Sequence, residues 1–432
     1  MIVKNRMGGG KRLLLLGGSQ WKDAIKQYAV DYDVTLIATG NDQSAGIFEI
    51  ADESYNVNST DAEAMKRLIR DAKVDGVYMG GSETVINTAC QYLNELGLPC
   101  YCTHEQWELF QNKHNFKQLL KKHGLPVCPE YTIDPTDVGN SVPESEFPVI
   151  VKPADGCGSS GFSVCRSQKE LSTAYEHAAE NSPTGTVICE KFVKNQGVVI
   201  IYTFSNGKVL FSGVEDKYPV RYEKQGSYVA GLFVFESNYA DELRSKYEAN
   251  LTKLFNSVGL KEGTLWIEVF HDGDNWYFNE AGFRYGGSIS VYPVDYIHNI
   301  NQVYADIYYA LTGESKYEGF ESLIPSTVER GQKYGIYAVH AEAGILDRYA
   351  GKEELESNRN IIKVFLTKPE KSRIESTGSF SQVVALVHFL FSSAQELKEM
   401  IEIIHSSLQA IDDKGNNLVT RMLDINKANI KV

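Results

Sequence analysis

The run KPADGCGSSG, from Lys152 to Gly161, combines a lysine with small residues in a way that suits phosphate binding. The apolar runs PVIV and FSVC flank it, so it is predicted to be a hairpin loop between two strands. Glycine lets backbone amides come close to an anion. It is not a P-loop, because no Gly-Lys-Ser/Thr sequence opens a helix, and a surface hairpin without a ligand remains the alternative. The candidate phosphate contacts are Lys152, Gly156, Gly158, Ser159, Ser160 and Gly161.

Two carboxylates, Glu268 and Glu280, lie on runs typical of neighbouring strands, joined by the turn-rich HDGDN. If this hairpin is centred on Asp274, the two carboxylates face each other, and like charges directly opposite are destabilising. Mg²⁺ would compensate, since it prefers a few carboxylate oxygens together with substrate phosphates. A shift of the centre by half a residue would instead pair Glu268 with Asn279, so the metal-site hypothesis depends on the register.

Arg284 follows the second carboxylate by four residues. A guanidinium group there suits binding of a phosphate or carboxylate oxygen, and the glycines after it free backbone amides nearby. An ordinary surface arginine is the alternative. The residues that would line the same cleft are Tyr285, Gly286, Gly287 and Ser288.

Glu190 closes the apolar run TVIC and is followed by Lys191-Phe192-Val193. A carboxylate beside backbone donors and acceptors can bind an adenine edge, with the glutamate accepting from the exocyclic amine. By itself this pattern is weak evidence for a nucleotide site.

The helices and strands expected to position these residues follow two different patterns along the chain. From residue 11 to about 104, short apolar runs alternate with amphipathic stretches, which predicts a parallel sheet with helices on its faces. Gly17-Gly18 follows the first run, but GGSQWK is not GxGxxG, so a tight turn is favoured over a dinucleotide site. After a helix over 104–123, strands pair as hairpins, one with its turn at Asn206-Gly207, and helices over 169–181, 241–258 and 295–311 separate them.

Composition limits the function further. The 432 residues suggest two to four domains, and the net charge of -13 argues against general nucleic-acid binding. The seven cysteines are odd in number and contain no CxxC pair, which is typical of reduced thiols and not of zinc. The apolar run at residues 13–16 is too short for a signal segment or a membrane span. We expect a cytoplasmic protein without membrane or nucleic-acid partners.

Together the motifs resemble the ATP-grasp superfamily. The shared order is a lysine at a helix start (Lys113), a strand lysine with a glycine loop, the EKFV hinge, and two acidic residues twelve apart followed by arginine. The resemblance implies α/β and α+β folds: an N-terminal parallel α/β domain that precedes the grasp module (1–104), an ATP-grasp domain of two α+β subdomains (105–315, with a lid at about 125–195) and a C-terminal α+β domain (316–432).

The resemblance also implies roles. Lys113 and Lys152 would contact the phosphates of ATP, and the glycine loop would close over them. Glu190 would bind the adenine amine, with the backbones of Lys191 and Val193 on the ring edge.

For the metal, Glu268 and Glu280 would hold Mg²⁺, with Mn²⁺ as an alternative, and Arg284 would stabilise the transferring phosphoryl group. Two positions depart from the pattern of relatives. Gly282 stands where many carry a metal-binding asparagine, for which Asn279 could substitute only if its strand is bulged. Gly197-Val198 stands where many carry a polar ribose ligand.

The implied activity is that of an ATP-dependent carboxylate–amine ligase with an acyl-phosphate intermediate, similar to the L-amino-acid ligases. Its partners would be a small carboxylate and an amine. In the segment 215–231, Lys217 and Arg221 are candidates for binding a substrate carboxylate, and a solvated loop with ordinary charges is the alternative. Two alternatives stay open: a nucleotide-binding regulatory protein without turnover, which Gly282 favours, and a bicarbonate-activating carboxylase, which the lack of an AMKM-like sequence disfavours. The apolar run SQVVALVHFLF is a candidate homodimer interface.

Overall fold

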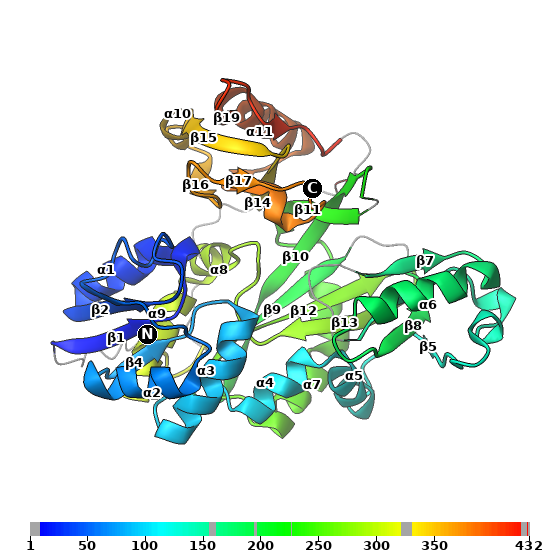
Figure 1. Cartoon of the computed structure of the whole chain (residues 1–432), viewed down its shortest axis with the longest axis horizontal. Coiled ribbons are helices and arrows are strands. Elements are labelled where there is room, and N and C mark those ends of the chain that lie inside the picture. Colours follow the sequence, from blue (N-terminus) through cyan, green and yellow to red (C-terminus); the bar gives the residue numbers. More distant parts are fainter. Residues whose placement is uncertain are drawn as a thin grey trace.

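The computed structural model describes residues 9–154, 161–193, 197–225, 227–320, 331–424 and 430. Three lobes surround a long central sheet (Figure 1). The N-terminal lobe is a parallel sheet in the order β3-β2-β1-β4, as its alternating pattern predicts. Its elements are β1 (Lys11–Leu15), α1 (Lys22–Tyr32), β2 (Val34–Thr39), β3 (Glu53–Tyr55), α2 (Ala62–Asp71), β4 (Gly76–Tyr78) and α3 (Glu83–Leu96).

The predicted helix over 104–123 is two helices, α4 (His104–Gln111) and α5 (Lys113–Lys122). Asn112 breaks it, because its backbone is extended and its side chain accepts a hydrogen bond from the backbone amide of Asn115 at 3.0 Å. Asparagine favours such an N-cap over a helix interior. The break makes Lys113 the first residue of α5.

The second lobe, which we call the lid, is an antiparallel sheet in the order β5-β8-β6-β7, with α6 packed on one face. In β6 burial alternates, so Lys152 points away from the face on which Val149 and Val151 contact α6. The lid elements are β5 (Glu130–Tyr131), β6 (Val149–Pro153), β7 (Ser163–Cys165), α6 (Leu171–Glu180) and β8 (Val187–Lys191).

The central sheet begins with two hairpins. Asn206 and Gly207 both have positive φ, 52° and 71°, as the predicted two-residue turn requires. The predicted helix over 295–311 is broken at Asn299, which is left-handed at φ 54°. The elements are β9 (Val198–Ser205), β10 (Lys208–Tyr222), β11 (Ser227–Phe235), α7 (Ala240–Val258), β12 (Gly263–His271), β13 (Trp276–Gly282), α8 (Val291–His298) and α9 (Gln302–Thr312).

The C-terminal segment adds strands to the same sheet. Within the described residues its order is β13-β12-β9-β10-β11-β14-β18-β16, and β20 pairs with β14. All nine residues of β18 are buried between β14 and β16, so the run SQVVALVHFLF lies inside the sheet and does not present a dimer surface. The elements are β14 (Lys333–Ala341), β15 (Gly344–Ala350), α10 (Lys352–Glu356), β16 (Ile361–Leu366), β17 (Arg373–Ile374), β18 (Val383–Phe391), α11 (Ala394–Ser407), β19 (Gln409–Asp412) and β20 (Val419–Thr420).

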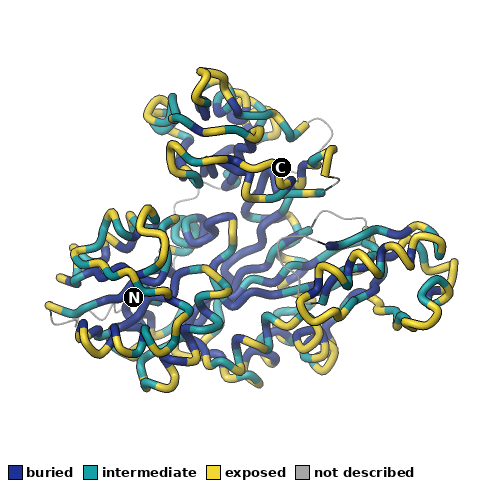
Figure 2. The backbone as a smooth tube through the Cα atoms, in the orientation of Figure 1, coloured by how far each residue is buried: buried dark blue, intermediate teal, exposed yellow. Residues whose placement is uncertain are grey.

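The buried backbone follows the central sheet (Figure 2). One face carries Ile200, Tyr202 and Ile267 and packs with α7, α4 and α5. The opposite face carries Ile201 and Phe233 and packs with α8, α9 and the N-terminal lobe. Among the described helices, none combines the length and the apolar character needed to cross a membrane.

Candidate functional site

The hairpin of β12 and β13 brings both predicted carboxylates to one face. Near the turn Val269 pairs with Phe278, a register that would place Glu268 opposite Asn279. A β-bulge after Glu268 leaves Asn279 as the extra residue, so Glu280 pairs with Glu268. The Asn279 amide donates to Glu268 Oε2 at 2.8 Å. The two registers considered from the sequence are thus combined, and Asn279 adds an amide to the acidic pair.

Three lysines from separate elements meet this group. Lys113 Nζ of α5 lies 3.3 Å from Glu280 Oε2. Lys152 Nζ of β6 donates to Asn279 Oδ1 at 3.3 Å, and Lys217 Nζ of β10 donates to Glu268 Oε1 at 3.0 Å. The fold therefore gathers the lid, α5 and the central sheet around one acidic hairpin.

A buried cluster of charges connects the lid to α5. Glu190 is 1% exposed, and its Oε2 lies 2.9 Å from Lys152 Nζ. Its other oxygen forms an ion pair with Lys117, which is 0% exposed and lies 3.5 Å from Glu130 Oε1. The sequence reasoning missed Lys117. Its spacing of four residues from Lys113 places both lysines on one face of α5 and could have revealed it.

Burial and neighbouring charges shift the pKa values of these groups. Burial lowers the pKa of Lys152 to about 7, and the positive charges of Lys117 and Lys113 add to the effect. Burial opposes ionisation of Glu268, yet Lys217 and the Asn279 amide hold its pKa below the usual value. Attraction to Glu268 in turn raises the pKa of Lys217. The carboxylate stays ionised, whereas Lys152 gives up its proton more readily than an ordinary lysine.

Gly282 leaves room for a tryptophan. A Cβ at Gly282 would lie 2.5 Å from Nε1 of Trp266, its partner on β12, so no side chain fits there beside the indole. The guanidinium of Arg284 lies over this ring at 5.4 Å. Arg284 also donates from Nε to Glu83 Oε1 at 3.1 Å and from Nη1 to the Tyr285 carbonyl at 2.7 Å. The predicted phosphate ligand is therefore held by α3 of the N-terminal lobe.

The predicted substrate residues separate into two groups. Ser288 Oγ donates to the buried Glu215 Oε2 at 2.8 Å, and Gly287 faces open space. Gly286 lies beside Ser290, whose Oγ would be 3.1 Å from an added Cβ.

Tyr285 and Arg221 have other surroundings. The Tyr285 hydroxyl donates to Asp306 in the core, and its ring packs edge-to-face on Trp21 at 4.9 Å. Arg221 is half exposed, lies 3.5 Å from Glu223 and covers the Tyr228 ring. A buried aromatic and a surface arginine thus occupy two positions that we expected in the substrate cleft.

The predicted nucleotide residues are described in part. Gly156, Gly158, Ser159 and Ser160 lie outside the described residues. Gly161 has a φ of +74°, and a Cβ there would lie 2.5 Å from Asn181 Cβ, so close packing and backbone conformation both require glycine.

The hinge after β8 is anchored on both sides. The Lys191 amide donates to the Pro129 carbonyl at 2.9 Å, so this amide already has a hydrogen-bond partner within the protein. The Lys191 ammonium lies 3.2 Å from Asp272 Oδ2 and 3.3 Å from the Tyr277 hydroxyl. Val193 follows this strand at the edge of the described segment. The predicted adenine contacts therefore sit where the lid strand meets the β12–β13 hairpin.

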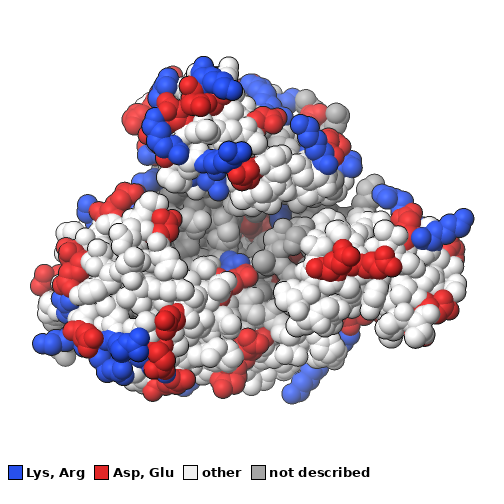
Figure 3. All heavy atoms as spheres, viewed as in Figure 1, with Lys and Arg blue, Asp and Glu red and all other residues white. Residues whose placement is uncertain are grey.

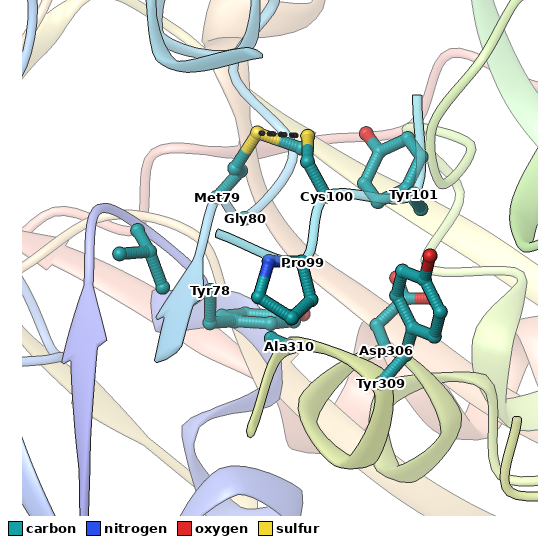
Figure 4. Close-up of a pocket in the computed structure, with 10 residues that line it drawn as sticks. Tyr78, Met79, Gly80, Pro99, Cys100, Tyr101, Asp306, Tyr309 and Ala310 are labelled. Atoms are coloured by element: carbon teal, nitrogen blue, oxygen red, sulfur yellow. Dashed lines mark hydrogen bonds between the residues drawn. The ribbon is translucent and has the colours of Figure 1, made fainter. Parts of the chain in front are cut away.

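The molecule has a recess where the three lobes meet, with charged atoms of both signs in it (Figure 3). A separate cavity lies between β4, residues 99–101 and α9, beside Asp306 and Tyr101 (Figure 4). Its volume is about 10 Å³, enough for one water molecule and too small for a substrate.

The residues present fit a magnesium triphosphate. Mg²⁺ is commonly bound by one or two carboxylates together with phosphate oxygens. Glu268, Glu280 and the amide oxygen of Asn279 provide such a partial set. The lysines that now pair with these acids would be available to phosphate oxygens once a cation takes the acids.

Comparison with known proteins places this site in context. Residues 112–201 match the family described as carbamoyl-phosphate synthase L chain, ATP binding domain. The phosphoribosylamine–glycine ligase of Methanopyrus kandleri is 27% identical over 237 residues, which is 51% of this chain and 52% of that enzyme, so the match spans about half of it. The formate-dependent phosphoribosylglycinamide formyltransferase of Cronobacter sakazakii is 23% identical over 81% of this chain and 90% of its own.

Solved structures share the fold over nearly the whole chain. The L-amino acid ligase from Bacillus licheniformis has a TM-score of 0.74 at 18% identity and covers 94% of this chain and 100% of its own. The biotin carboxylase domain dimer of the 2-oxoglutarate carboxylase from Hydrogenobacter thermophilus, solved with MgADP and bicarbonate, has a TM-score of 0.76 at 17% identity and covers 96% and 92%.

Proposed function

We propose that this chain, which belongs to the ATP-grasp superfamily, is an ATP-dependent ligase that joins a small carboxylate to an amine. The convergence of Lys113, Lys152 and Lys217 on the Glu268–Glu280 hairpin carries the proposal. Several cations beside two acids suit a reaction in which two anions, a carboxylate and a triphosphate, must be held together.

In this proposal the site residues have separate roles in binding ATP and the metal. Lys113 and Lys152 bind the phosphates, and Glu190 and the hinge backbone face the nucleotide base. Mg²⁺, held by Glu268 and Glu280, would neutralise charge on the phosphates. With a pKa of about 7, Lys152 is only about half protonated at neutral pH, so it regains a full positive charge when a phosphate becomes its neighbour.

The reaction proceeds in two transfers. A carboxylate oxygen of the first substrate attacks the γ-phosphorus, the bond to the β–γ bridging oxygen breaks, and ADP leaves. The amine nitrogen then attacks the acyl carbon, and inorganic phosphate departs as the C–N bond forms. Arg284 and Lys217 lie on the same side of the sheet as the acids and stabilise the charge on the transferred group.

Amino acids are the proposed substrates. The support is the fold shared with the L-amino acid ligase and the sequence similarity to the phosphoribosylamine–glycine ligase, whose name contains an amino acid. A second candidate is nucleotide binding without turnover, which is favoured by Trp266 in the space beside Gly282 and by the contact of Arg284 with Glu83.

The test is ADP release. The protein is incubated with ATP, Mg²⁺ and each standard L-amino acid, alone and in pairs, and ADP and the new amide are quantified. We expect ADP and amide in equal amounts for at least one combination. Glu280→Gln should abolish both, whereas Asp274→Asn, at an exposed position of the same hairpin turn, should leave both unchanged. Nucleotide binding without ADP release in any mixture would support the second candidate.

A further inference from the structure

A third carboxylate lies in line with the acidic pair. Glu280 pairs with Glu268, Glu268 pairs with Val199, and Val199 pairs on its other side with Glu215. Residues in one such row point to the same face of a sheet. Glu215 thus lies on the same face of the sheet as the predicted metal ligands, two strands away from Glu268.

Glu215 is a buried carboxyl with few compensating contacts from the protein. It is 2% exposed, and Ser288, 3% exposed, donates to its Oε2 at 2.8 Å. Within the described chain, Oε1 accepts no hydrogen bond and no cation forms an ion pair with Glu215. Lys217, the nearest cation on its strand, contacts Glu268 instead. Ionising a buried carboxyl with so little compensation is costly, so the charged form of Glu215 requires a cationic partner from outside the chain.

The separation between Glu215 and the Glu268–Glu280 pair defines the space available to this external partner. Neighbouring strands lie about 4.8 Å apart, so Glu215 and Glu268 sit on backbones separated by about 10 Å. This separation leaves room for a second substrate between Glu215 and the acidic pair, beside the open space at Gly287.

Resting on the ligase function proposed above, we propose that Glu215 and Ser288 form the subsite for the amino group of the amine substrate. The amine arrives as an ammonium ion, donates a hydrogen bond to Glu215 and transfers one proton to it. The free lone pair then attacks the acyl carbon, the C–O bond to phosphate breaks, and the second nitrogen proton leaves with the departing phosphate. Glu215 returns its proton to solvent.

The electrostatics agree with this role. Burial raises the pKa of Glu215 to about 8, against the hydrogen bond from Ser288 and the charge of Lys217, while Asp216 adds to the rise. In the empty site at neutral pH the carboxyl of Glu215 is therefore mostly protonated. The positive charge of an arriving ammonium ion favours the carboxylate form, which then accepts a proton more readily than an ordinary solvated carboxylate does.

Hydroxylamine distinguishes a loss of amine deprotonation from a general loss of activity. It is already uncharged at neutral pH, so it captures an acyl phosphate as a hydroxamate without needing a base. For the amino-acid pair that the wild type joins, Glu215→Gln should lower kcat/KM for the amine by about 100-fold or more. ADP release and hydroxamate formation with hydroxylamine should stay at wild-type rates.

A second variant and two controls complete the design. Ser288→Ala should raise the KM for the amine about ten-fold through the lost hydrogen bond. Ser290→Ala removes a buried hydroxyl of the same loop that has no partner in the described chain, and Glu236→Gln replaces a half-buried carboxyl that accepts a hydrogen bond from the Val214 amide. Both controls should match the wild type.

The outcomes are distinct. A wild type that forms no hydroxamate with any amino acid overturns the proposed function itself. A wild type that forms hydroxamate, with Glu215→Gln losing hydroxamate and amide equally, or losing neither, overturns the amine subsite alone.

Discussion

Gly282→Ala is the sharpest test of how the site is built. The added Cβ would lie 2.5 Å from Cε2 and Nε1 of Trp266, whereas ordinary contacts begin at 3.4 Å, so the indole must move by 3.4 − 2.5 = 0.9 Å. The ring is held between β13 and the guanidinium of Arg284. Overpacking of this kind costs about 1–3 kcal/mol. The lower entropy of the unfolded alanine chain returns up to about 1 kcal/mol in any Gly→Ala variant, so Gly282→Ala should be about 1–3 kcal/mol less stable than another Gly→Ala variant without the clash.

The assay is urea unfolding followed by circular dichroism, with stability read from the midpoint at constant slope. Gly287→Ala is the matched control, because a Cβ there meets nothing within 4 Å and its φ is not positive. In a double-mutant cycle, Trp266→Leu should relieve the clash and give a coupling energy of at least about 1 kcal/mol. A Gly282→Ala variant as stable as the Gly287→Ala control would refute the packing of Trp266 against Gly282.

Three further perturbations probe buried charges. Burial raises the pKa of Asp306 from 3.8 to about 7, so the stabilisation by its protonated form is complete below about pH 4 and is lost as pH rises to 7. The interval from about pH 5 to pH 8 covers about two pH units of this loss, so Asp306→Asn should gain up to ~3 kcal/mol relative to the wild type between these two pH values in urea unfolding. An unchanged difference would contradict the raised pKa. Glu83→Gln should lower turnover by releasing Arg284 while changing the unfolding midpoint by less than about 1 kcal/mol, since the pair is partly exposed; equal turnover would exclude a positioning role. Lys117→Met should cost about 3 kcal/mol or more by leaving Glu190 with one fewer cation, and wild-type stability would show that the pair contributes little.

The sequence predicted the fold class and the facing acids because both depend on local periodicity. Apolar runs of period two defined β12 and β13, and the turn between them limited the register to two choices. The bulge at Asn279 combines both choices, with one register on the turn side of Asn279 and the other beyond it. Bulges depend on how a strand packs against its neighbours, so the local sequence pattern did not predict the bulge at Asn279.

Contacts between distant segments account for the rest. Arg284 meets Glu83 across about two hundred residues, and only the folded chain brings α3 to that point. Tyr285, beside that arginine, is buried against Trp21 for the same reason, although an aromatic residue after an arginine also fits a substrate cleft. Asn112 and Asn299 ended helices that a periodicity argument extended, because asparagine favours caps and left-handed turns.

The pairing of β11 with β14 has a consequence for engineering. A chain cut before β14 would bare a long edge whose residues Leu232, Val234 and Phe235 are fully buried in the intact protein. Such a strand invites pairing with another molecule. Exchanging the last hundred residues between relatives therefore replaces part of a shared sheet. Chimaeras should be joined at loops that keep β11 and β14 from the same parent protein.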